Sequence, residues 1–514
     1  ERLFALPRSS WADYDRMLIS AGGGVWSRAD KQLKLTPQAK ALLGLAADTV
    51  TPAEVVKAIL KLPVDLLWNG GIGTYVKAAD ESHAQVGDRA NDAVRVDGRE
   101  LRCKVVGEGG NLGFSQRGRI EYARHGGRLN TDFIDNSAGV NCSDVEVNIK
   151  ILLSLAERRR GLKRPARDRL LARMTDDVAA LVLRTNYLQS QAISALESRA
   201  RDRLGEHAHA IRGLERGADL DREIEFLPSD EAITERAQQG QGLTRPEISV
   251  VLSYSKIWLY NQLIQSDVPE DAYLSNELER YFPEDVRDRY ADLLRAHPLK
   301  REIIATATTN SVINRMGPVF PLRAQEDTGA SLGQIARAFA IARESTNMRA
   351  LWAEIEGLDN RVAAGVQYEM IDESSRVLRH GTYWVLGHCG KDLDVERAVA
   401  RLRPGLAELV EAAPRLLEGR IGERIERKRA RYLEANVPEA VATRVATLEM
   451  LKSGLDIVDV ATARKVPILQ AARAYLRLGT RLDLDWLRLQ IEQLSASGHW
   501  QSVARGTLRD NLYQ

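Results

Sequence analysis

Cysteine is scarce in this sequence of 514 residues. Cys103, Cys142 and Cys389 are too few and too widely spaced for a disulfide framework or a thiolate metal site. Free thiols persist in a reducing compartment, so the simplest expectation is a cytoplasmic protein. His207 and His209 have no carboxylate or cysteine pattern at ligand spacing, so we expect no metal site.

Long apolar runs and an excess of one charge are missing as well. No apolar run approaches the roughly 20 residues that cross a bilayer, and the N-terminus has no signal-peptide pattern. Lysine and arginine number 73 against 71 acidic residues, and a net charge of +2 provides no field to hold nucleic acid or an anionic membrane. The basic segment 158–173 has helical apolar spacing, which favours a solvated helix face. We therefore expect neither nucleic acid nor membrane as a partner.

The sequence also lacks a Ser-His-Asp arrangement, a Walker loop and aromatic-basic interleaving, which argues against hydrolase, NTPase and nucleic-acid chemistry. What it contains, 44% hydrophobic and 28% charged residues, is typical of a globular protein with about three to five domain-sized units. It begins at Glu1 rather than methionine, which suggests a processed product or a piece of something longer.

Glycine separates two regions of different texture. Residues 1–140 hold 17 of the 38 glycines, and the apolar runs 64–68 and 101–106 stop at glycine clusters, as buried strands of a parallel sheet do. After about Asp144, apolar residues recur at steps of three and four, with Pro165 near a helix start. The sequence therefore predicts an α/β layer followed by a packed all-α region. The clearest helical stripe consists of Leu171, Met174, Val178, Leu181, Thr185, Leu188, Ala192 and Ala195.

Three turns rich in glycine or asparagine, at residues 68–73, 107–113 and 135–139, each follow a predicted strand. Loops beyond the carboxyl ends of strands line the ligand crevice of an open α/β sheet, although tight strand-exit turns are the simpler explanation for each alone. The second turn spaces its glycines one residue wider than the dinucleotide fingerprint, and residues 119–127 look more strand-like than helical. We therefore do not expect it to be the phosphate loop, which would lie upstream of Glu1.

Ser143 begins a capping-box pattern with Glu146 ahead of an apolar helix at 145–155, which predicts that Ser143 is the N-cap. A helix N-terminus beside a crevice also binds carboxylates through free N–H groups. Both roles stay open at this point.

Several motifs together resemble the bacterial large NAD-specific glutamate dehydrogenases, and the similarity extends along nearly the whole chain. The motifs lie at residues 9–28, 64–75, 106–113, 134–152, 174–187, 243–256 and 303–317. The resemblance implies the C-terminal half of a Rossmann-like dinucleotide-binding domain at 1–150 and an all-helical region at 151–514. It further implies NAD as cofactor, L-glutamate and 2-oxoglutarate as substrates, a homo-oligomer, and the remaining N-terminal part of the same polypeptide as a partner.

The resemblance also assigns site residues. Residues 108–111 look like the E-G-A-N loop of the smaller amino-acid dehydrogenases, and residues 136–140 look like their N-A-G-G-V pattern. The substitutions, Gly110 for alanine and Ser137-Ala138 for Ala-Gly, keep the loops small. Ser143 falls where those enzymes hold the side-chain carboxylate of glutamate. The implied cofactor contacts are Asn69, Gly70, Gly71, Gly109, Gly110, Asn111 and Asn136.

The catalytic lysine and aspartate of that family, and its phosphate-binding fingerprint, have no match here, so we expect no catalytic residue in this chain and no activity from it alone. Two alternatives are that the helical region is a regulatory or oligomerisation module, and that the enzyme acts on another amino acid. A hydroxyl at Ser143 suits a substrate with a second carboxylate better than an aliphatic one.

Overall fold

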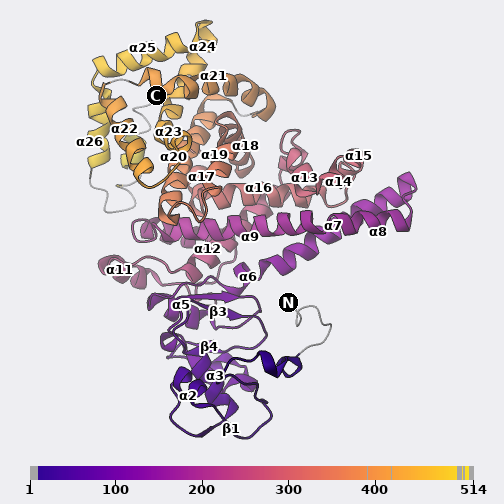
Figure 1. The fold of residues 1–514 in the computed structure, drawn as a ribbon. Coiled ribbons are helices and arrows are strands. Elements are labelled where there is room, and N and C mark those ends of the chain that lie inside the picture. Colours follow the sequence, from indigo (N-terminus) through magenta and orange to yellow (C-terminus); the bar gives the residue numbers. More distant parts are fainter. Residues whose placement is uncertain (1–9, 391, 418, 495–500, 502–503, 509–514) are drawn as a thin grey trace. The chain divides into compact units, whose positions relative to one another are not determined.

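The computed structural model describes residues 10–390, 392–417, 419–494, 501 and 504–508 (Figure 1). The chain divides into two compact units. Unit 1 consists of residues 1–137 and 244–249, and unit 2 of residues 138–243 and 250–514. The described residues are mostly helical, with few and short strands.

Unit 1 contains three pairs of strands connected by short helices. Its strands are β1 (Leu33–Lys34), β2 (Thr49–Val50), β3 (Leu66–Asn69), β4 (Val76–Lys77), β5 (Val96–Asp97) and β6 (Val105–Glu108). Its helices are α2 (Pro37–Leu43), α3 (Pro52–Leu60), α4 (His83–Val86), α5 (Gln116–Arg124) and α6 (Asp132–Asp135). The pairs β3–β6 and β4–β5 are parallel, as predicted for this region, and β1–β2 is antiparallel.

The β3–β6 pair is parallel but is not buried on both faces as expected. Leu66 faces Val105 across the pair and Trp68 faces Gly107, and Leu66 and Trp68 are 56% and 61% exposed. The second edge of β6 is bridged to Arg128, whose carbonyl accepts from the Val106 N–H. Among the described residues no further strand pairs with β3, so β3 is an edge strand whose outer face is apolar.

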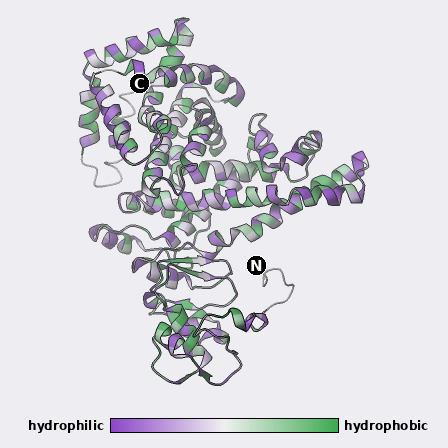
Figure 2. Cartoon of the chain, in the orientation of Figure 1, coloured by the Kyte–Doolittle hydropathy of each residue, from purple (hydrophilic) through white to green (hydrophobic). Residues whose placement is uncertain are grey.

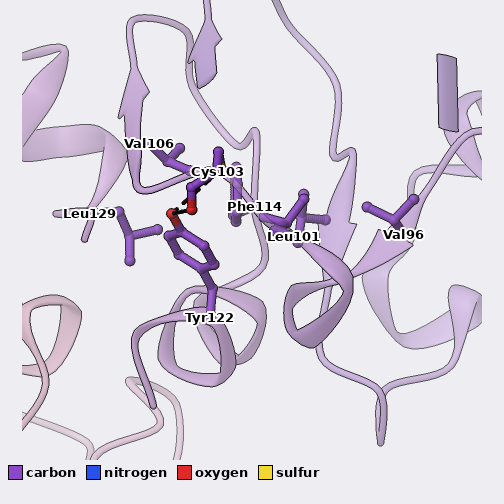
Figure 3. Packing of buried hydrophobic residues seen from close by; sticks show 8 residues of the cluster. Val96, Leu101, Cys103, Val106, Phe114, Tyr122 and Leu129 are labelled. Atoms are coloured by element: carbon purple, nitrogen blue, oxygen red, sulfur yellow. Dashed lines mark hydrogen bonds between the residues drawn. The ribbon is translucent and has the colours of Figure 1, made fainter. Parts of the chain in front are cut away.

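A small core packs strands β4, β5 and β6 of unit 1 against α5 (Figure 3). Its buried members are Val76, Val96, Leu101, Cys103, Val106, Phe114, Tyr122 and Leu129. The Tyr122 hydroxyl donates to the Cys103 carbonyl at 2.8 Å, which satisfies the one polar group that this ring brings into the core. Burial raises the pKa of the Cys103 thiol. The core therefore fixes α5 directly behind the end of β6.

Helix α5 corrects the prediction that residues 119–127 are strand-like. Ser115 is its N-cap and accepts from the Gly118 N–H at 3.0 Å, and the helix buries Arg119, Ile120 and Tyr122. Ile120 and Tyr122 are two residues apart, which imitates strand alternation. The segment after the second turn is thus a helix. Of the two arguments against a phosphate loop at this turn, the strand-like character therefore fails. The glycine spacing, one residue wider than the dinucleotide fingerprint, remains an argument against it.

The region around residue 137 also differs from the prediction. The third turn follows helix α6 rather than a strand, and Asn136 is the C-cap of α6. Helix α7 (Ser137–Arg160) begins eight residues before the helix expected at 145–155. Ser143 therefore lies inside α7, and the prediction that it is an N-cap is wrong.

Unit 2 consists of packed helices, with apolar and polar faces visible on most of them (Figure 2). They are α7, α8 (Arg164–Arg173), α9 (Thr175–Glu197), α10 (Leu204–Gly217), α11 (Asp230–Gln238), α12 (Arg245–Ile264), whose first residues belong to unit 1, α13 (Asn276–Tyr281), α14 (Glu284–Arg287), α15 (Ala291–Leu294), α16 (Lys300–Met316), α17 (Val319–Thr328), α18 (Leu332–Ser345), α19 (Met348–Glu356), α20 (Ala364–His388), α21 (Val395–Leu416), α22 (Gly419–Glu434), α23 (Glu439–Thr447), α24 (Met450–Arg464), α25 (Ile468–Arg481) and α26 (Leu484–Gln493).

Helix α18 forms the centre of unit 2 and is buried along most of its length against α20 and α21. A Cβ on Gly381 of α20 would lie 3.1 Å from Cβ of Ala342, so these two helices approach closely. The long predicted stripe at 171–195 divides between α8 and α9 at Met174, and Pro165 lies in the first turn of α8 as predicted. None of the helices in the described ranges combines the length and apolar character of a bilayer-spanning helix.

Candidate cofactor site

The loops that follow β3 and β6 are joined by their backbones. The Asn69 carbonyl at the end of β3 accepts from the N–H groups of Gly109 and Gly110 at 2.8 and 2.9 Å. These bonds continue the parallel pairing by two residues beyond the strands. Residues 69–71 and 109–111, which the sequence assigned to one site, therefore lie side by side.

At Gly110 and Gly113 neighbouring atoms leave no space for a Cβ, so both positions require glycine. A Cβ on Gly110 would lie 2.5 Å from the Gly71 carbonyl oxygen, and a Cβ on Gly113 would overlap the amide of Asn69. Gly107 and Gly109 lie beneath the indole of Trp68, which a Cβ at either position would meet within 3 Å. The two loops thus approach backbone to backbone, which leaves peptide groups rather than side chains at their surface.

The side-chain amide of Asn69 is a hydrogen-bond donor that lacks an acceptor. Its Nδ2 atom is buried and has no hydrogen-bond partner among the described residues. A buried amide N–H that lacks a partner costs about 1–3 kcal/mol, so such groups are usually satisfied by water or a ligand. The unsatisfied amide lies in the loop that the family resemblance assigned to the cofactor.

Asn111 and Asn136 lie together at the outer edge of these loops. The Asn136 side-chain amide donates to the side-chain oxygen Oδ1 of Asn111, and Asn111 is exposed. The Asn136 N–H in turn donates to the Asp132 carbonyl at 2.8 Å, which fixes it at the end of α6. Two amides from different loops therefore present donors and acceptors to the solvent at one place.

An ion pair that sequence reasoning did not identify supports the loops from beneath. Arg119 of α5 donates to both carboxylate oxygens of Glu108 at 2.7 and 2.9 Å, and it lies 3.3 Å from Asp132. Glu108 is fully buried and Arg119 is 5% exposed. Burial raises the pKa of the Glu108 carboxyl, whereas the bonds from Glu108 outweigh burial and raise the pKa of the Arg119 guanidinium. The two-bond geometry favours the charged pair.

The carboxylates of α6 fix the loop backbone directly. Asp132 accepts from the Leu112 N–H at 2.8 Å, where Leu112 has a φ of 61°, and Asp135 accepts from the Glu108 N–H at 3.1 Å. Burial raises the pKa of Asp135, while Asn130, which donates to it at 2.7 Å, opposes that shift. The segment 108–112 is thus held at both ends by side chains of α6. Only a correct helical assignment of α5 and α6 could have revealed this arrangement.

The structure brings seven of the eight predicted site residues into unit 1 and leaves one elsewhere. The seven assigned to the cofactor occupy the β3 and β6 loops and the end of α6. Ser143 belongs to unit 2 and is exposed, and its hydroxyl has no hydrogen-bond partner among the described residues. No group of three or more metal-ligating side chains occurs in the described part of the chain.

Two family models match this chain. The model for the catalytic domain of bacterial NAD-glutamate dehydrogenase matches residues 1–196, and the model for the C-terminal part of glutamate dehydrogenase matches residues 240–514. The chain belongs to the glutamate dehydrogenase family. This confirms the resemblance to the bacterial NAD-specific enzymes.

Curated relatives show how much of a family member the chain represents. It is 47% identical to the NAD-specific glutamate dehydrogenase of Pseudomonas aeruginosa, 46% to that of Halomonas elongata and 38% to that of Mycobacterium tuberculosis. Each match covers the whole chain but 32% of the relative. The chain therefore spans about a third of the length of these glutamate dehydrogenases.

The loops of unit 1 fit the cofactor that the family uses. The close contact between Gly110 and Gly71 holds the β3 and β6 loops together and leaves peptide groups rather than side chains at their surface. The Asn111–Asn136 pair and the unsatisfied Asn69 amide supply groups that can bond a carboxamide or a ribose hydroxyl. In a family member that binds NAD at these loops, residues 69–71, 109–111 and 136 would be the ones to hold it, and the cofactor would supply a hydride acceptor.

Proposed function

We propose that this chain supplies the nicotinamide side of the active site of an NAD-dependent glutamate dehydrogenase. The enzyme converts L-glutamate reversibly to 2-oxoglutarate and ammonium, using NAD, and this chain is inactive alone. Residues 1–150 form the C-terminal half of a Rossmann-like domain, and residues 151–514 form the helical region. The observation that carries the proposal is the backbone contact between the β3 and β6 loops, lined by Asn69, Gly110 and Asn111.

The exposed face of β3 supports the view that the domain continues in another part of the polypeptide. Leu66, Trp68 and Val105 leave 56%, 61% and 40% of their surfaces exposed on one face of the β3–β6 pair. Two strands alone are marginal in water, and parallel sheets are normally covered on both faces. The remaining strands and helices of a Rossmann-like domain would bury these side chains and pair with the free edge of β3.

In this proposal the chain binds and orients rather than transfers protons. Asn111 and Asn136 bond the cofactor at the rim, and Glu108 and Arg119 hold the loop that carries Asn111. The Ser143 hydroxyl donates to the side-chain carboxylate of glutamate. The lysine and the acid that polarise the substrate and move protons belong to the part of the polypeptide outside this chain.

Substitutions in the full-length enzyme test these assignments separately. Asn111→Ala should raise the KM for NAD and leave the KM for glutamate unchanged. Ser143→Ala should raise the KM for glutamate by roughly 10- to 150-fold, because a hydrogen bond to a charged group contributes about 1.5–3 kcal/mol. Ser198→Ala, at an exposed serine that bonds only the Ala195 carbonyl of its own helix, is the control. Unchanged kinetics in Ser143→Ala would remove the substrate role of Ser143.

Assembly into a cytoplasmic homo-oligomer is a second role that one surface of unit 2 favours. Leu478, Leu482, Trp486 and Leu487 of the α25–α26 region are 56%, 60%, 52% and 40% exposed. Large apolar side chains gathered on one surface mark interaction sites. Leu482→Glu should shift the molar mass measured by light scattering toward the monomer, and an unchanged mass would exclude this surface as the interface.

A further inference from the structure

One face of helix α20 in unit 2 carries a group of charged residues that the proposed cofactor site does not use. Four polar residues recur there at steps of four, three and four, which places them on one side of the helix. They are Asp372, Arg376, Arg379 and Tyr383. Helix α20 packs against α9 and α17 (Figure 1), and α17 packs against α10. Arginines from α17 and from the connection between α9 and α10 join this face. We call the five arginines the α20 arginine cluster, which consists of Arg199, Arg203, Arg323, Arg376 and Arg379.

The carboxylate of Asp372 is shared by three members of this cluster. Arg203 and Arg199 lie 2.6 and 3.1 Å from it, and Arg376 of the following turn lies 2.9 Å from it. One negative charge balances only one of three guanidinium groups. An excess of positive charge therefore remains at this end of the face.

At the other end of the face, the acid is occupied as well. Asp327 of α17 accepts from the Tyr383 hydroxyl at 2.7 Å and lies 3.6 Å from Arg323. Arg379 is about one turn from Arg376 and about one turn from Tyr383, so it lies between the two occupied acids.

Arg379 is the member of the cluster that lacks a partner. Its guanidinium makes no hydrogen bond and has no carboxylate within 4 Å among the described residues. Burial lowers the pKa of Arg379, and Glu206 opposes that shift. The positive charges of Arg203 and Arg323 lower the pKa further. A partly buried cation beside two like charges is unfavourable by itself, and an anion bound among them would remove the repulsion.

The first turn of α10 adds the positive end of a helix at the same place. Arg203 is the N-cap residue of α10 and its side chain makes no capping bond, and Glu206 lies in the first turn. The free N–H groups of a first turn and the helix dipole both favour a bound anion. A Cβ on Gly205 would have no atom within 4 Å, so there is open space beside this turn.

We propose that the α20 arginine cluster binds a phosphate group through the guanidinium groups of Arg379 and Arg203 and the first turn of α10. A guanidinium bonds two oxygens of a phosphate at once, which a lysine cannot do. Six cations meet four carboxylates at this face. A phosphate monoester carries a charge of about −1.5 to −2 at pH 7, so the bound group would balance the excess. The cations are the cluster and Lys428, and the acids are Asp327, Asp372, Glu373 and Glu206. All of these residues belong to unit 2, so the proposal holds whether or not unit 1 binds NAD.

Isothermal titration calorimetry of chain 1–514 with inorganic phosphate and with glycerol 3-phosphate, at constant ionic strength, tests the proposal. We expect saturable binding that Arg379→Gln weakens at least about tenfold, because the bond lost joins two charged groups. Arg397→Gln removes the same charge from an exposed position of α21, and this matched control should bind phosphate as the wild type does. Glu206→Gln should bind phosphate more tightly, because it removes a negative charge beside the bound anion.

The two ligands separate the sources of the phosphate group. Tighter binding of glycerol 3-phosphate supports a phosphorylated small molecule as the ligand, and tighter binding of inorganic phosphate supports the free ion. Absence of saturable binding of both ligands to the wild type would overturn the proposal. Equal weakening by Arg379→Gln and Arg397→Gln would also overturn it, because the loss would then follow the overall charge. If Arg379→Gln does not fold, Glu206→Gln decides, and phosphate binding no tighter than that of the wild type would contradict the proposal.

Discussion

Gly110→Ala tests the contact between the two loops most closely. The added Cβ would lie 2.5 Å from the Gly71 carbonyl oxygen, 2.9 Å from its carbonyl carbon and 3.1 Å from its nitrogen. All three are backbone atoms, so no flexible side chain can move aside. The loops must separate, and overpacking of this kind costs roughly 1–3 kcal/mol. The backbone bonds from Gly109 and Gly110 to Asn69 would weaken at the same time.

Hydrogen exchange of the β3 and β6 amides in chain 1–514 measures this cost. A loss of roughly 1–3 kcal/mol corresponds to exchange about 5- to 150-fold faster, since each 1.4 kcal/mol is a factor of ten. Gly71→Ala is the matched control, because a Cβ there has no atom within 4 Å and should change stability by no more than about 0.5 kcal/mol. If Gly110→Ala exchanged at the wild-type rate, the described loop contact would be wrong.

Two further predictions concern buried charge. Arg119→Met should lower the free energy of unfolding by roughly 3–5 kcal/mol in urea titrations, because it leaves Glu108 and Asp132 buried without their cation; a loss below about 1 kcal/mol would contradict this. Burial lowers the pKa of His207 from 6.5 to about 4, so between those values the unfolded chain binds more protons than the folded one. The contribution of His207 to the free energy of unfolding should therefore be complete above pH 6.5 and should fall by about 3 kcal/mol as the pH is lowered toward 4. His207→Asn should flatten that decline in urea titrations, while the exposed control His125→Asn should keep it; a wild-type profile in His207→Asn would refute the assignment.

The sequence predicted the loops of unit 1 better than the elements that hold them. Glycine clusters at the ends of two apolar runs placed Asn69 and Gly110 in turns at the ends of strands of a parallel sheet, because strand-end turns have a distinct composition. The exposure of Leu66 and Trp68 was not predicted. Burial depends on the strands and helices that cover a sheet, and the apolar composition of a strand does not reveal them.

The errors around α5 and α7 have a common cause. Ile120 and Tyr122 alternate like a strand, yet the Ser115 cap and the burial of Arg119 against Glu108 select a helix. The capping-box pattern at Ser143 predicted a helix start, yet α7 begins at Ser137. In both cases a short local pattern did not decide the secondary structure of the segment. The Glu108–Arg119 pair could not be found from the sequence, because its partners meet only when α5 is a helix.

The most direct test of the central proposal is glutamate-dependent reduction of NAD, followed by the absorbance of the reduced cofactor, by chain 1–514 and by the full-length polypeptide under the same conditions. Loops that bind and orient the cofactor without a proton-transfer lysine should give no turnover in chain 1–514 above the rate without enzyme. The full-length polypeptide should reduce NAD. Steady turnover of glutamate by purified chain 1–514 would contradict the proposal that it supplies only one side of the active site.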